Sequence, residues 1–78
     1  MAQKTSNQKI LVLNSGSSSL KFQVFELYSE KSLFKGEIDA INKEMCAFID
    51  YSKHKPERFP AKIADHVGAV LFALKILL

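Results

Sequence analysis

The sequence predicts an α/β protein, α+β when taken as an isolated piece, with three or four mainly antiparallel strands followed by one helix. Apolar runs of strand length recur between residues 9 and 51, and short turn signals separate them. Near the carboxyl end, apolar residues instead recur three and four positions apart, which is typical of a helix. The close spacing of the runs favours an antiparallel meander over βαβ units.

The first two strands are expected on either side of a serine-rich turn. Residues 1–8 are polar and predict a disordered lead-in. Residues 9–14, KILVLN, predict a buried strand because they place apolar side chains on both faces. The segment SGSS at 15–18 is a turn signal. Residues 19–28 then predict a second strand, whose first half alternates between apolar and polar positions.

The middle of the chain predicts two further strands and a loop. Residues 33–41, LFKGEIDAI, form the third strand candidate, with Gly36 marking a bulge. Residues 46–51, CAFIDY, predict a short fourth strand. Residues 52–60 are polar, include two prolines and predict a loop.

The predicted helix begins near Pro60 or Ala61, because proline is favoured in the first turn of a helix. Its apolar stripe consists of Ile63, Val67, Val70, Leu71, Leu74 and Leu78. Further apolar residues carry this surface round most of the second half, and such a helix requires burial on several sides. We therefore expect this chain to be a piece of a larger protein.

Size and composition limit the possible classes of protein. A chain of 78 residues, 47% hydrophobic and 24% charged, allows one small globular domain with a marginal core. Cys46 is the only cysteine, so no disulfide can form within the chain. A single thiol fits a reducing compartment, and we expect the protein to be cytoplasmic.

Charge and hydropathy argue against nucleic-acid and membrane partners. The net charge of +3 is dispersed, without the basic stripe and interleaved aromatic residues of nucleic-acid binders. The apolar run at 67–78 is too short to span a membrane. It is also a poor membrane-surface helix, because Lys75 is its only basic residue.

The stretch VLNSGSSSLKF concentrates small hydroxyl residues at one bend. In an extended chain Ser17, Ser19 and Lys21 project to the same face. Gly16 can adopt a positive φ and lets backbone N–H groups approach an anion closely. Asn14 ends the first strand, where its side-chain oxygen could face a hydrated metal ion. Together these groups would suit the phosphates of a nucleotide and its divalent cation.

From the residues alone, a serine-rich hairpin with an exposed lysine explains the same stretch. The segment is not a Walker A loop, which needs G-x-x-x-x-G-K-[ST] leading into a helix. Elsewhere, His54 is expected in solvent, His66 beside an apolar edge, and Cys46 as a small buried hydrophobic residue. Four phenylalanines are expected in the core rather than stacked on bases, namely Phe22, Phe25, Phe34 and Phe48.

KILVLNSGSSSLKFQVFEL, residues 9–27, resembles the amino-terminal signature of acetate kinases, N-[SA]-G-S-S-S-[LIV]-K-[FY] between two strands. SLFKGEIDAI and ADHVGAVLFALKIL resemble the next strand and the Asp-His-x-x-Ala helix of that family. The resemblance implies a ribonuclease H-like kinase fold, in which residues 9–78 would be the incomplete amino-terminal part of the nucleotide-binding domain, with the first strands and one helix. It also implies transfer of the γ-phosphoryl group of ATP to acetate with Mg²⁺, and a homodimer.

The same resemblance implies roles at matching positions. Asn14 would lie at the magnesium ion and the transferring phosphoryl group. Ser17 and Ser19 would donate hydrogen bonds to phosphate oxygens, Lys21 would lie at the nucleotide phosphates, and Gly16 would let them approach. No catalytic residue of the family falls within this chain, so we expect the chain alone to be inactive. Propionate and butyrate kinases share the signature, and a non-catalytic self-associating module is the alternative from another class.

Overall fold

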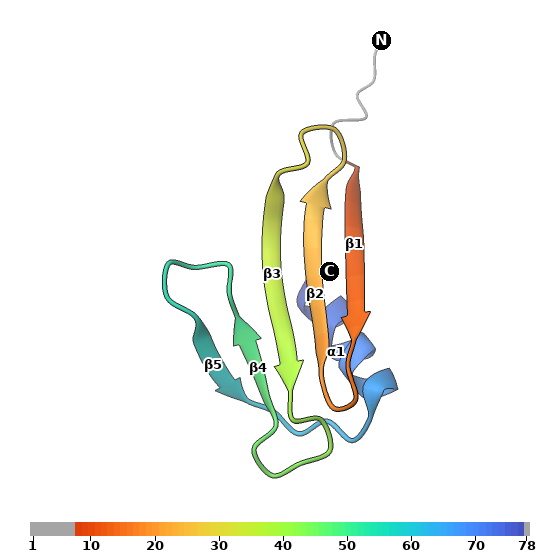
Figure 1. Ribbon diagram of the computed structural model, residues 1–78, viewed down its shortest axis with the longest axis vertical. Coiled ribbons are helices and arrows are strands. Elements are labelled where there is room, and N and C mark those ends of the chain that lie inside the picture. Colours follow the sequence, from red (N-terminus) through yellow and green to blue (C-terminus); the bar gives the residue numbers. More distant parts are fainter. Residues whose placement is uncertain (1–7, 78) are drawn as a thin grey trace.

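The computed structural model describes residues 8–77, which form one antiparallel sheet and one helix (Figure 1). The strands lie side by side in chain order, so each is joined to its neighbour by a hairpin. The elements are β1 Lys9–Ser15, β2 Leu20–Glu26, β3 Ser32–Asp39, β4 Ala47–Asp50, β5 Glu57–Pro60 and α1 His66–Leu77. The α/β class and the antiparallel meander are confirmed, with one strand more than expected.

The core lies between one face of the sheet and α1. Alternation on β2 turns Leu20, Phe22 and Val24 toward this face, and all three are buried. Figure 1 shows α1 crossing behind β1 and β2, and its Ala69 and Ala73 are completely buried there. The opposite face of β2 carries Lys21 and Gln23 and is therefore the face away from the helix.

Strand β1 forms as predicted, but the prediction that it is buried was wrong. It lies at the edge of the sheet with β2 as its only neighbour. Residues Ile10, Leu11, Val12 and Leu13 are 36–47% exposed. A strand that is apolar on both faces is stable when both faces are covered. Whether they are covered depends on other segments, which the pattern of the strand itself does not describe.

Gly36 does not mark a bulge, which corrects a second expectation. It pairs regularly with Phe22, and the shift in register lies between Val24 and Phe25. A methyl group built on Gly36 would lie 2.9–3.1 Å from atoms of three phenylalanine rings. Gly36 is therefore explained by the space that these rings occupy.

The boundary between sheet and helix also differs from the prediction. Residues 57–60, predicted as loop, form β5 against β4, and the helix begins at His66 rather than near Pro60. Pro60 is tolerated because it ends an edge strand. Asp65 caps the helix, since its Oδ1 accepts the N–H of Gly68 at 2.8 Å.

The helix presents another face to the sheet than the apolar stripe predicts. Val67 and Leu71 are 69% and 62% exposed, whereas the small residues Ala69 and Ala73 form the centre of the contact. Small side chains let the helix backbone approach the sheet closely, which periodicity of large apolar residues does not reveal. Within residues 8–77, no helix has both the length and the hydropathy that crossing a membrane requires.

The expected disordered lead-in falls largely outside the described residues. Gln8 is described, and its carbonyl accepts the N–H of Leu27 at 3.0 Å.

Candidate functional site

The sheet face turned away from α1 brings two of the predicted site residues together. Asn14 on β1 lies directly opposite Lys21 on β2, and Lys21 lies opposite Glu37 on β3. Side chains directly opposite each other on antiparallel strands are within contact range. The three strands therefore present an amide, an ammonium and a carboxylate in one row across the sheet.

This row borders a shallow hollow of about 290 Å³. Its lining consists of Val12, Asn14, Lys21, Phe22, Gln23, Lys35, Gly36, Glu37 and Tyr51. Lys35 brings a second ammonium group, so two lysines accompany one glutamate on this face. The hollow is open to solvent and suits a flexible anionic group better than a compact apolar one.

Tyr51 closes one side of the hollow and orients Glu37. Its hydroxyl donates to Glu37 Oε1 at 3.2 Å. Partial burial of the phenol raises the pKa of Tyr51, and the bond to Glu37 raises that pKa further. Glu37 thus has a partner other than Lys21, and no ion pair of Lys21 occurs within residues 8–77.

The serine-rich bend is a tight turn that joins β1 to β2. The N–H of Gly16 donates to the carbonyl of Ser19 at 2.9 Å. Gly16 does not have a positive φ, contrary to expectation. A methyl group there would lie 2.7 Å from Ser19 Oγ, so the Ser19 side chain would have to rotate to accommodate it.

The predicted common face for Ser17, Ser19 and Lys21 holds only in part. Lys21 lies on the polar face of the sheet with Asn14, and Ser19 directly precedes β2 and is half-buried. Ser17 lies at the exposed tip of the turn and borders a different hollow, behind the bend. The chain reverses at Ser17, so the parity of an extended strand does not apply to it.

Two contacts from distant segments fix the turn from behind. The N–H of Ile41 donates to the carbonyl of Ser18 at 2.8 Å, and Nε2 of His66 lies 2.8 Å from the carbonyl oxygen of Gly16. Sequence reasoning placed His66 beside an apolar edge and missed this contact. No local pattern could reveal it, because 50 positions separate the two residues.

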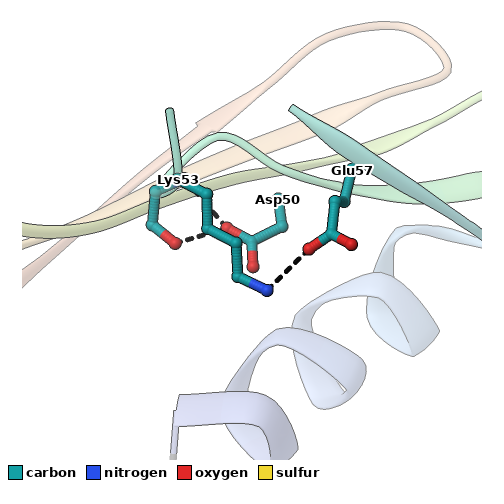
Figure 2. A network of polar contacts seen from close by, with 4 residues as sticks. Asp50, Lys53 and Glu57 are labelled. Atoms are coloured by element: carbon teal, nitrogen blue, oxygen red, sulfur yellow. Dashed lines mark hydrogen bonds and ion pairs between the residues drawn. The ribbon is translucent and has the colours of Figure 1, made fainter. Parts of the chain in front are cut away.

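The remaining polar clusters serve the fold. Figure 2 shows the loop before β5, where Asp50 Oδ1 accepts hydrogen bonds from Ser52 and Lys53 Nζ lies 2.6 Å from Glu57 Oε1. The Ser52 hydroxyl lowers the pKa of Asp50, and the hydrogen bond to Glu57 raises that of Lys53. These groups lie in solvent, in the loop between β4 and β5.

The other residue types considered from the sequence take structural positions. Cys46 is buried, as expected, and the rings of Phe22, Phe34 and Phe48 stack in the core with centroids 5.8–6.4 Å apart. Phe25 is only half-buried and lies outside this core, so the expectation for Phe25 was wrong. Among the described residues, no three His, Cys, Asp or Glu side chains are grouped so that they could hold a metal ion.

Comparison with known proteins places these features in a family. A model described as "Acetokinase family" matches residues 9–78. An acetate kinase of Bacillus cytotoxicus is 44% identical over 62 residues, which cover 80% of this chain and 16% of that protein. Acetate kinases of Bacillus mycoides and Brachyspira hyodysenteriae are 42% and 36% identical over 67 and 70 residues, covering 86% and 87% of this chain but 17% and 18% of theirs. The chain thus spans about a sixth of the length of these curated relatives.

Proposed function

Because the chain belongs to the acetokinase family, we propose that it is the amino-terminal part of an acetate kinase and supplies the hairpin that binds the phosphates of ATP. The whole enzyme would transfer the γ-phosphoryl group of ATP to acetate, giving acetyl phosphate and ADP. It would act in the cytoplasm as a homodimer. Propionate or butyrate remains the alternative acceptor, because the residues of the sheet face that carries Lys21 do not identify the acyl group.

The observation that carries this proposal is the position of Lys21. Its ammonium group is exposed on a polar face, opposite Asn14 and beside a tight turn of small residues. Lysine acts as a point charge for phosphate, and a turn without bulky side chains lets backbone N–H groups reach phosphate oxygens. Ser17 and Ser19 would add hydroxyl donors, and Gly16 the close backbone approach.

Magnesium fits this site only together with the nucleotide. Asn14 offers one neutral amide oxygen, and Mg²⁺ is commonly held by one or two protein ligands, several waters and substrate phosphates. We infer that Asn14 faces a hydrated Mg²⁺ that enters bound to ATP. The ion would neutralise charge on the phosphates during transfer.

The hairpin alone is not expected to catalyse the reaction. Phosphoryl transfer needs charge stabilisation from several sides, and an arginine in such a site contributes about 10³–10⁵ in rate. Arg58 is the only arginine in the sequence. It lies on β5, where its guanidinium pairs with Asp39 at 3.5 Å and donates to the carbonyl of Met45 at 3.3 Å. A phosphotransfer assay of the 78-residue chain with acetate and Mg·ATP should give no turnover above background.

Calorimetric titration with Mg·ATP tests the binding role. Lys21→Ala should weaken binding by about 10- to 150-fold, since a charge-assisted hydrogen bond contributes roughly 1.5–3 kcal/mol. Lys31→Ala is the matched control, because Lys31 lies in the exposed turn at the other end of β2. If both substitutions weakened Mg·ATP binding equally, Lys21 would contribute only through the net charge of the chain, and its assignment to the phosphate site would be refuted.

One observation favours a second candidate function, a self-associating module. The apolar edge strand β1 and the exposed Val67 and Leu71 of α1 leave apolar surface uncovered. Sedimentation separates the two functions: association that ignores Mg·ATP supports the module, whereas nucleotide binding lost in Lys21→Ala supports the kinase part.

A further inference from the structure

The contact between His66 and Gly16 joins the helix to the turn that we assign to phosphate binding. His66 Nε2 lies 2.8 Å from the Gly16 carbonyl oxygen. A carbonyl oxygen only accepts hydrogen bonds, so Nε2 carries a hydrogen and donates it. The side chain is half-buried between α1 and the turn, in a position that no packing requirement of the core explains.

Because the peptide group is planar, the contact with His66 also orients the N–H group that follows Gly16. In a trans peptide group the C=O and the following N–H point in opposite directions, and the described residues contain no cis peptide. The Gly16 carbonyl points toward His66 on the helix side, so the N–H of Ser17 points away from the helix. In the same way, the bond from Ile41 to the Ser18 carbonyl turns the N–H of Ser19 away from Ile41.

The N–H groups oriented in this way have no partner in the structure. Within residues 8–77, the N–H groups of Ser17 and Ser19 donate no hydrogen bond to another group of the chain. The side of the sheet away from the helix is the one that carries Asn14 and Lys21. The two oriented carbonyls thus leave unpaired N–H groups in the turn that joins the strands of Asn14 and Lys21.

We propose that His66 is a positioning residue for phosphate binding: it fixes the Gly16 carbonyl so that the N–H of Ser17 stays directed at the polyphosphate of ATP. This inference rests on the proposed ATP site. His66 itself does not touch the nucleotide, because it contacts the turn from the opposite side. Its effect is to remove the cost of ordering the turn when ATP binds.

The start of the helix does not depend on His66, which makes the proposal testable by substitution. Asp65 caps the helix through its bond to Gly68, and its carbonyl accepts the N–H of Ala69 at 3.0 Å. The carbonyl of Ile63 accepts the N–H of Asn42 at 2.8 Å, which holds the preceding segment. Loss of the imidazole therefore removes the contact to the turn and leaves these other contacts in place.

The experiment compares His66→Leu with His66→Gln. The amide nitrogen of glutamine can take the place of Nε2 and donate to Gly16, whereas leucine fills the space without donating. Calorimetry should show Mg·ATP binding about three- to tenfold weaker in His66→Leu, the range for one lost hydrogen bond, and within twofold of the unsubstituted chain in His66→Gln. His54→Leu, in the exposed loop before β5, is the matched control and should bind normally.

Amide hydrogen exchange supplies a readout independent of ATP. The exchange rate of the Ile41 N–H, which donates to the Ser18 carbonyl of the turn, should rise in His66→Leu and return in His66→Gln, while that of Ala69 in the helix stays unchanged. If the unsubstituted chain binds Mg·ATP and both variants bind equally well, the positioning role is refuted and the proposed function stands. If the unsubstituted chain does not bind Mg·ATP, the proposed ATP site fails, and the positioning role fails with it. If exchange at Ala69 also rises and glutamine restores neither readout, His66 is structural and the inference is overturned.

Discussion

Replacing Gly36 with alanine tests whether ring packing determines this residue. Gly36 lies on the core face of β3, and a Cβ added to it would be 2.9 Å from Phe22, 3.0 Å from Phe34 and 3.1 Å from Phe48. To restore ordinary contact at 3.4 Å, each ring must withdraw by about 0.3–0.5 Å. Phe48 also contacts Phe59 and Phe72, with ring centroids 5.8 and 5.7 Å away, so its movement displaces further side chains.

Overpacking of this kind costs about 1–3 kcal/mol. A chain of 78 residues is expected to have a free energy of unfolding of about 4–12 kcal/mol, so the loss is a large fraction of the total. We expect Gly36→Ala to lower Tm by roughly 4–8 °C for each kcal/mol lost. Urea unfolding followed by circular dichroism measures the change in free energy directly.

Gly68→Ala is the matched control, with the opposite expected sign. A Cβ on Gly68 would meet its nearest atoms at 3.4 Å, and alanine is favoured over glycine in a helix by about 0.5–1 kcal/mol. Gly68→Ala should therefore stabilise the chain. A Gly36→Ala variant as stable as the unsubstituted chain would refute the packing argument, whatever the control shows.

Three further predictions concern the helix, the tyrosine and the exposed surface. Asp65→Ala should lower the free energy of unfolding by about 0.5–2 kcal/mol in urea titrations, because the helix loses its cap. Tyr51 should titrate above its ordinary pKa of 10.0, and Glu37→Gln should bring the pKa measured by ultraviolet titration closer to that value. Because the pKa of Tyr51 is raised in the folded chain, the protonated phenol stabilises the fold below pH 10, and this stabilisation is lost as the pH rises through the folded pKa. Lysine at Val12 and at Leu71 should shift the chain toward monomer in sedimentation, and unchanged association would remove these surfaces from the interface.

Local patterns predict most of the sheet. The alternation of Leu20, Phe22 and Val24 is enough to identify β2 and its buried face, and the serine-rich turn fixes the first hairpin. Strand β5 has no such pattern: its four residues are all exposed, and it exists because the edge of β4 offers hydrogen-bond partners. Pairing with an existing strand edge depends on the tertiary structure, so it cannot be predicted from the few residues of the strand itself.

The candidate site, too, could be predicted only where it depends on local sequence. The opposition of Asn14 and Lys21 follows from a short hairpin, because few residues in the turn leave little freedom of register. The orientation of the Gly16 and Ser18 carbonyls in the turn depends instead on contacts with His66 and Ile41, which are distant in sequence. The helix face is a third example, since the buried Ala69 carries little hydrophobic pattern of its own.

The central claim is that the β1–β2 hairpin binds the polyphosphate of ATP. The test replaces its two hydroxyl donors and its ammonium group together. The triple variant carries alanine at Ser17, Ser19 and Lys21. Its control carries alanine at Ser29, Lys31 and Ser32, which remove the same groups around the hairpin between β2 and β3.

The measurement is the dissociation constant of Mg·ATP for the two triple variants and the unsubstituted chain, by calorimetry at one fixed ionic strength. The account predicts that affinity falls by more than tenfold in the β1–β2 variant and by less than twofold in the control. Binding of equal strength in both variants would contradict the assignment of these residues to ATP.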